Sequence, residues 1–90
     1  MAHNKSLNII LWNAISVKNK ITDLQNFLDI QNTDIAILTE TWLAPSDKIR
    51  LRNYNIYRKD GTPTTQNKPR GGILIATHKN IPVEDTSHQT

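Results

Sequence analysis

The chain has 90 residues, of which 37% are hydrophobic and 21% charged, and its formal net charge is +3. This length allows one globular domain with a thin core, and the absence of cysteine excludes disulfides and thiolate metal sites. No apolar stretch is long enough for a signal peptide or a membrane span. We therefore expect an intracellular protein, nuclear or cytoplasmic, whose mild basicity weakly favours an anionic partner such as nucleic acid.

The first predicted elements are a strand and a helix. Residues 7–13, LNIILWN, are mostly apolar and predict a largely buried strand that ends on Asn13. Ser16 is placed to cap a following helix that ends near residues 31–32. Its polar face includes Lys20. Its apolar positions fall on one helical face: Val17, Ile21, Leu24, Phe27 and Leu28.

A second strand follows this helix and ends beside an acidic residue. Residues 35–38 are apolar without alternation, which predicts a central strand covered on both faces. A helical connection of this length favours parallel pairing with the first strand. Parallel pairing would bring Asn13 and Glu40 to the same edge of the sheet, where open α/β sheets bind ligands. The alternative for Glu40 is an ordinary solvated acid at a strand end.

The rest of the chain predicts a hairpin. Residues 47–51 suggest a short helical turn capped by Ser46. Residues 54–58 and 72–77 have the pattern of two antiparallel strands joined by a polar loop over 62–69. Residues 83–86 begin a further strand that does not finish within the sequence, so we expect the sheet to have an unpaired edge and one uncovered face.

Four motifs occur in order along almost the whole chain: W-N-A at 12–14, E-T-W-L at 40–43, Y-R-K-D at 57–60 and R-G-G-I-L-I-A at 70–76. Together they resemble the start of the endonuclease/exonuclease/phosphatase family, and most of all the endonuclease domain of jockey-like non-LTR retrotransposons. The resemblance implies that residues 1–90 form the N-terminal part of a four-layer α/β sandwich. This part would be a mixed β-sheet with a covering helix, and the sandwich would be incomplete.

The same resemblance implies a metal-dependent enzyme that cuts phosphodiesters. Asn13 would orient the scissile phosphate or a metal-bound water, and Glu40 would be a ligand of Mg²⁺ or Mn²⁺. Beside the resemblance, the basic residues around the 62–69 loop are candidates to contact DNA phosphates, and the alternative is a solvated basic surface: Arg58, Lys59, Lys68 and Arg70. The family's later G-D-F-N and S-D-H motifs are absent from these 90 residues, so we expect the fragment alone to be inactive.

Three functions follow from these observations. In the first, the chain is the N-terminal part of an endonuclease that nicks target DNA. The new 3′ end then primes reverse transcription by a downstream reverse transcriptase domain. Its partners would be DNA, the rest of the endonuclease domain and that polymerase. The second is another phosphodiesterase of the family, such as a repair exonuclease or phosphoesterase. The third is a non-catalytic nucleic-acid-binding or relic fragment, whose DNA affinity would depend on salt and not on Glu40.

Overall fold

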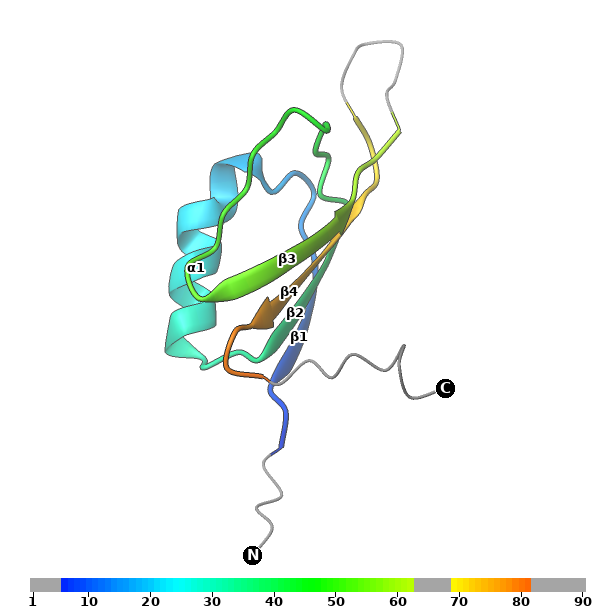
Figure 1. The fold of residues 1–90 in the computed structure, drawn as a ribbon. Coiled ribbons are helices and arrows are strands. Elements are labelled where there is room, and N and C mark those ends of the chain that lie inside the picture. Colours follow the sequence, from blue (N-terminus) through cyan, green and yellow to red (C-terminus); the bar gives the residue numbers. More distant parts are fainter. Residues whose placement is uncertain (1–5, 63–68, 82–90) are drawn as a thin grey trace, which may run out of the picture.

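The computed structural model describes residues 6–62 and 69–81. This part of the chain forms one mixed sheet with one covering helix, which confirms the expected α/β class (Figure 1). The elements are β1 (Ile9–Asn13), the 3₁₀ turn η1 (Lys18–Lys20), α1 (Ile21–Ile30), β2 (Ile35–Thr39), β3 (Tyr54–Lys59) and β4 (Ile73–His78).

The strands lie in the order β1-β2-β4-β3. β1 and β2 are parallel, while β4 is antiparallel to both β2 and β3. The β-α-β unit and the β3–β4 hairpin are therefore confirmed, and β2 is an inner strand as predicted. The register aligns the last residues of β1 and β2 with one end of the hairpin, so a single row crosses the sheet from Asn13 through Thr39 and Ile73 to Lys59.

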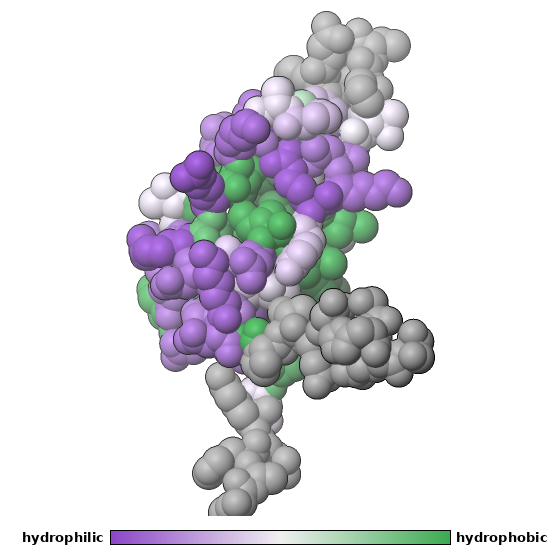
Figure 2. All heavy atoms as spheres, in the orientation of Figure 1, coloured by the Kyte–Doolittle hydropathy of each residue, from purple (hydrophilic) through white to green (hydrophobic). Residues whose placement is uncertain are grey.

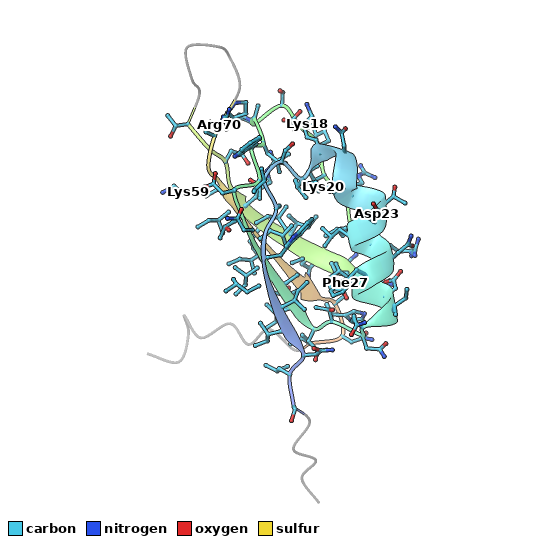
Figure 3. The ribbon with its side chains drawn as sticks, turned by 180° about the vertical axis from the view of Figure 1, so that it is seen from behind. Lys18, Lys20, Asp23, Phe27, Lys59 and Arg70 are labelled. Atoms are coloured by element: carbon cyan, nitrogen blue, oxygen red, sulfur yellow. The ribbon has the colours of Figure 1, made fainter. Side chains whose placement is uncertain are left out.

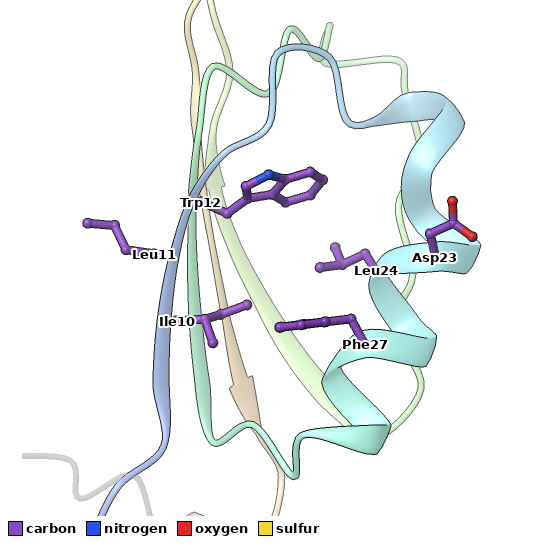
Figure 4. Close-up of a pocket in the computed structure, with 6 residues that line it drawn as sticks. All are labelled: Ile10, Leu11, Trp12, Asp23, Leu24 and Phe27. Carbon is purple, nitrogen blue, oxygen red and sulfur yellow. The ribbon is translucent and has the colours of Figure 1, made fainter.

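α1 covers one face of the sheet and forms the core with it. Leu24 and Leu28 point from the helix toward the fully buried strand residues Leu38 and Leu74. At the open edge, the side chains of Ile10, Trp12, Leu24 and Phe27 project into the space between β1 and α1, whereas Leu11 points to the other side (Figure 4). This space is an apolar groove of about 380 Å³.

The opposite face of the sheet is apolar and is not covered by the described residues. Leu11 is 75% exposed and Ile9 52%, and Tyr57 and Ile73 lie on the same face with about half of their surface exposed. Apolar atoms are visible along the flank of the sheet away from α1 in Figure 2. Within residues 6–62 and 69–81 only the α1 side of the sheet has a second layer. The predictions that the first strand is largely buried and that the second is covered on both faces were therefore wrong for this part of the chain, whereas the expected uncovered face is present.

Two local predictions were wrong for a common reason. Ser16 does not cap the helix; its backbone is left-handed (φ 74°) and its N–H donates to the carbonyl of Glu40 at 2.9 Å, so η1 precedes α1. Residues 47–51 are not helical either. There the Asp47 carboxylate accepts the Ala44 N–H at 2.8 Å, which closes a tight turn instead. In both places a tertiary or side-chain hydrogen bond replaced the helical one.

Residues 83–86, for which a further strand was predicted, lie outside the described residues. Within the part that is described, no helix has the length and apolar character needed to cross a membrane.

Candidate functional site

The loops that leave β1 and β2 continue side by side beyond the strands. The N–H of Ala14 donates to the carbonyl of Thr39 at 2.8 Å, and the N–H of Val17 donates to that of Thr41 at 3.1 Å. These hydrogen bonds fix the backbone on both sides of Glu40. The predicted placement is thus confirmed: Asn13 and Glu40 lie at the same edge of the sheet, one residue apart in register. Their chemical roles stay predictions.

Left-handed backbone conformations gather at this edge. Ile15 (φ 45°), Glu40 (φ 54°) and Trp42 (φ 55°) all have positive φ, a conformation that is costly for residues with a Cβ and that recurs at functional sites. The loop before β4 approaches the same place: at Gly72 (φ 97°) a Cβ would lie 2.5 Å from the hydroxyl oxygen of Thr41. Only glycine fits there, and the N–H of Trp42 donates to the adjacent Gly71 carbonyl at 2.9 Å.

The side chain of Glu40 is partly buried and has one described partner. Its Oε1 accepts a hydrogen bond from Nε1 of Trp42 at 3.0 Å. Sequence analysis missed this contact, because both residues have left-handed backbones beyond the end of β2 and the alternation of a strand does not apply to them. Among the described residues the second carboxylate oxygen has no hydrogen-bond partner, so it can face a ligand.

The donor set suits a hard cation. The Glu40 carboxylate and the exposed Asn13 amide offer oxygen ligands, which Mg²⁺ prefers, and Mg²⁺ commonly binds through one or two carboxylates together with substrate phosphates. No group of three or more His, Cys, Asp or Glu side chains able to hold a metal occurs in residues 6–62 and 69–81. The arrangement therefore fits part of a Mg²⁺ site rather than a complete one.

Lys20 fastens the loop that follows Asn13. Its Nζ donates to the carbonyls of Ala14 at 2.6 Å and of Ile15 at 3.0 Å, and it lies 5.7 Å from the ring centroid of Trp12. The sequence placed Lys20 on the solvated face of a helix. Because η1 turns the chain before α1 begins, the ammonium instead reaches back to the end of β1 and holds that loop in place.

Basic side chains collect around the same end of the sheet. Lys18, Lys20, Lys59 and Arg70 lie there, and Asp23, in the first turn of α1, lies near Lys20 (Figure 3). The guanidinium carbon of Arg70 is 4.2 Å from the ring centroid of Trp42. Lys18 pairs with Asp47 at 3.1 Å, and the other three positive charges outnumber the carboxylates of Glu40 and Asp23, which favours an anionic ligand. Lys68, another predicted DNA contact, lies outside the described residues.

Arg58 is occupied by protein groups. Its guanidinium pairs with both carboxylate oxygens of Asp60 at 2.8 and 3.0 Å, and donates to the carbonyls of Asp47 at 2.6 Å and Ala44 at 2.8 Å. The carboxylate of Asp47 in this turn accepts the Ala44 N–H and lies 3.1 Å from the ammonium of Lys18. Both contacts favour the charged carboxylate and keep the pKa of Asp47 below its ordinary value. That Arg58 contacts DNA stays a prediction.

A substitution separates the two roles of Arg58. We expect Arg58→Gln to lower the free energy of unfolding by about 1–3 kcal/mol, because two carbonyls and the Asp60 carboxylate would lose their donor. The neighbouring Lys59, which is exposed, is the control: Lys59→Gln should change stability by less than about 0.5 kcal/mol. Urea denaturation of the 90-residue chain measures both. If Arg58→Gln left stability unchanged and weakened DNA binding, Arg58 would be a phosphate contact instead.

With this geometry established, comparison with known proteins is informative. No family model matches the chain. It is 28% identical over 69 residues to a probable RNA-directed DNA polymerase from transposon BS of Drosophila melanogaster, a match that covers 77% of this chain and 8% of that protein.

The solved structures that share the fold include the following two. One is an AP endonuclease from Archaeoglobus fulgidus, with a TM-score of 0.61 and 19% identity over 80% of this chain and 27% of that one. The other is the 3′ phosphatase NExo from Neisseria, bound to a product DNA hairpin, with a TM-score of 0.68 and 20% identity over 88% of this chain and 30% of that one. The chain thus spans less than a third of either structure.

These similarities confirm the resemblance found in the sequence. The chain shares the fold of the matched part of the AP endonuclease and of the 3′ phosphatase. The similarity in sequence to a transposon-encoded RNA-directed DNA polymerase agrees with an endonuclease/exonuclease/phosphatase segment of a non-LTR retrotransposon.

Proposed function

We propose that this chain is the N-terminal part of a divalent-metal-dependent endonuclease domain of a jockey-like non-LTR retrotransposon polyprotein. The domain nicks target DNA, and the released 3′-hydroxyl primes reverse transcription by a downstream polymerase domain. The observation that carries this proposal is the position of Asn13 and Glu40 at the ends of two adjacent parallel strands, within a basic edge of the sheet. The transposon polymerase relative supports the choice of DNA and of a downstream reverse transcriptase.

In this proposal, Glu40 would hold Mg²⁺ or Mn²⁺, and Asn13 would orient the scissile phosphate. The bound ion, when present, would stabilise negative charge on the phosphate and on the leaving oxygen. Arg70 contacts a neighbouring phosphate, and Lys68 has the same proposed role. Lys20 affects the position of Asn13 only through its hydrogen bonds to the loop that follows Asn13.

The remaining part of the domain has a structural task as well as a chemical one. The apolar outer face of the sheet, which includes Leu11, and the groove between β1 and α1 require cover by further chain segments. A second sheet on that face would complete a four-layer sandwich. We therefore propose that the 90 residues alone do not cleave DNA.

The proposal is tested on supercoiled plasmid. A longer protein that continues this chain to the length of its structural neighbours should convert the plasmid to open circles when Mg²⁺ is present and should lose this activity in excess chelator. The 90-residue chain is the matched comparison and should leave the plasmid intact. Nicking by the short chain would contradict the proposed dependence on further strands, and chelator-resistant nicking would contradict the metal.

A second function is favoured by the two structural neighbours, an AP endonuclease and a 3′ phosphatase. Duplexes that carry one abasic site or one 3′-phosphate separate the two proposals. If the longer protein processed these lesions much faster than it nicked intact DNA, a repair-type phosphodiesterase would be the better assignment. Equal or faster nicking of intact DNA supports the retrotransposon endonuclease. DNA binding that is weakened by salt, with no cleavage in any form, would leave only a binding module.

A further inference from the structure

Trp42 touches both charged groups of the proposed site. Its indole N–H donates a hydrogen bond to the Glu40 carboxylate at 3.0 Å. The guanidinium carbon of Arg70 lies over its ring, 4.2 Å from the ring centroid. The backbone N–H of Trp42 is bound to the Gly71 carbonyl at 2.9 Å, which holds the residue in its left-handed conformation (φ 55°). One side chain thus links the end of β2 to the loop that enters β4.

The two charges are neighbours that do not pair. Within residues 6–62 and 69–81, neither Glu40 nor Arg70 forms an ion pair, and the guanidinium of Arg70 makes no hydrogen bond. An arginine and a carboxylate that can reach each other form strong, often bidentate hydrogen bonds. Here each group contacts the indole of Trp42 instead: the Glu40 carboxylate accepts a hydrogen bond from the indole N–H, and the Arg70 guanidinium stacks on the face of the ring.

Keeping these groups apart matters for their proposed ligands. A carboxylate that is paired with arginine is a poor ligand for a divalent cation, and an arginine that is paired with a carboxylate has fewer donors for a phosphate. A hydrogen bond to one carboxylate oxygen also fixes the direction of the other oxygen, which is the usual task of groups behind metal ligands.

We propose that Trp42 is a positioning residue that orients Glu40 toward a divalent cation and keeps Arg70 separate from it as a donor to a phosphodiester oxygen. This inference rests on the proposed metal role of Glu40. It assigns Trp42 a task beyond packing, since a side chain that only filled space would not affect the affinity of Glu40 for a cation.

The test uses the 90-residue chain and Mn²⁺ alone, which broadens NMR signals close to its binding site even at low occupancy. In the unchanged chain, Mn²⁺ should broaden the amide signals of residues 39–41 first, and Glu40→Gln should abolish this selectivity. Trp42→Phe keeps a ring for Arg70 but has no N–H, and should weaken Mn²⁺ binding about tenfold. Trp12→Phe removes the other tryptophan and is the matched control, for which no change is expected.

A double variant tests the separation of charges. Trp42→Ala removes ring and N–H together, so Arg70 can approach Glu40 and Mn²⁺ binding should fall further than in Trp42→Phe. Adding Arg70→Gln to Trp42→Ala should then recover most of the Mn²⁺ affinity that Trp42→Ala loses beyond Trp42→Phe. Unshifted amide signals in α1 and β3 show that each variant is folded, and Trp42→Phe still decides the question if Trp42→Ala is not.

The outcomes separate this inference from the proposed function. If Glu40→Gln abolishes selective broadening while both Trp42 variants bind Mn²⁺ like the unchanged chain, the positioning role is overturned and the metal role of Glu40 stands. If Mn²⁺ broadening does not depend on Glu40, the metal role falls and the inference falls with it. Failure of Arg70→Gln to restore binding in the Trp42→Ala background would overturn the separation of charges.

Discussion

Glu40→Gln is expected to lower the rate of Mg²⁺-dependent plasmid nicking by the longer protein roughly 1,000-fold. A metal ion commonly supplies several kcal/mol of transition-state stabilisation in phosphodiester cleavage, and each 1.36 kcal/mol corresponds to a factor of about ten in rate. Glutamine keeps the size of the side chain and an oxygen that can accept the Trp42 hydrogen bond, but it removes the negative charge that holds the ion.

The matched control for this substitution is Asp23→Asn. Asp23 is an exposed carboxylate in the first turn of α1 and does not lie on the ends of β1 and β2, and its loss changes the net charge by the same amount (Figure 3). DNA affinity, measured by fluorescence anisotropy without Mg²⁺, should be unchanged or slightly higher in Glu40→Gln, because a negative charge is removed near the phosphates. A nicking rate within threefold of the unchanged protein, in a variant that still binds DNA, would show that Glu40 is an ordinary strand-end acid.

Hydrophobic pattern and connection length predicted the order and pairing of the elements correctly. The apolar run at 35–38 and the helical spacing before it were sufficient to place β2 inside the sheet and parallel to β1. That pairing in turn brought Asn13 and Glu40 together, because parallel strands end at the same edge. These features depend on periodicity, which a single sequence displays.

The details that the sequence did not specify depend on contacts between residues distant in the sequence. Ser16 has the chemistry of a helix cap, yet its N–H is bound by the carbonyl of Glu40 on the neighbouring loop. Arg58 has the charge of a phosphate contact, yet its donors meet a turn that lies 11 to 14 residues earlier. The contact of Trp42 with Arg70 arises only when the hairpin folds back. Local pattern cannot specify such partners.

The exposed sheet face illustrates a different limit. Leu11 and Leu38 look equivalent in the sequence, as apolar residues of apolar strands. In the structure Leu38 is fully buried beneath α1, whereas Leu11 is 75% exposed on the opposite face. The sequence identified the strands as apolar on both faces, but which face is covered depends on the segments that pack across the sheet.

Truncating these two leucines should therefore change the stability of the chain by very different amounts. Leu38→Ala should destabilise the 90-residue chain by about 3 kcal/mol, because truncating a fully buried leucine loses its burial and leaves a cavity. A domain of this size has a total stability of only about 5–13 kcal/mol, so the loss is a large share of it. Leu11→Ala is the matched control and should cost less than about 1 kcal/mol, the range of strand propensity alone. Urea unfolding, followed by tryptophan fluorescence, measures both.

The same pair of substitutions also tests whether the outer face is an interior surface of a larger domain. In the longer protein a covering sheet would bury Leu11, and Leu11→Ala should then cost about 2–5 kcal/mol, as at other buried leucines. The cost of Leu38→Ala should stay near its value in the short chain, because its surroundings beneath α1 are already complete. A Leu11→Ala effect that remained below 1 kcal/mol in the longer protein would mean that the apolar face stays open, and the proposed four-layer sandwich would be wrong.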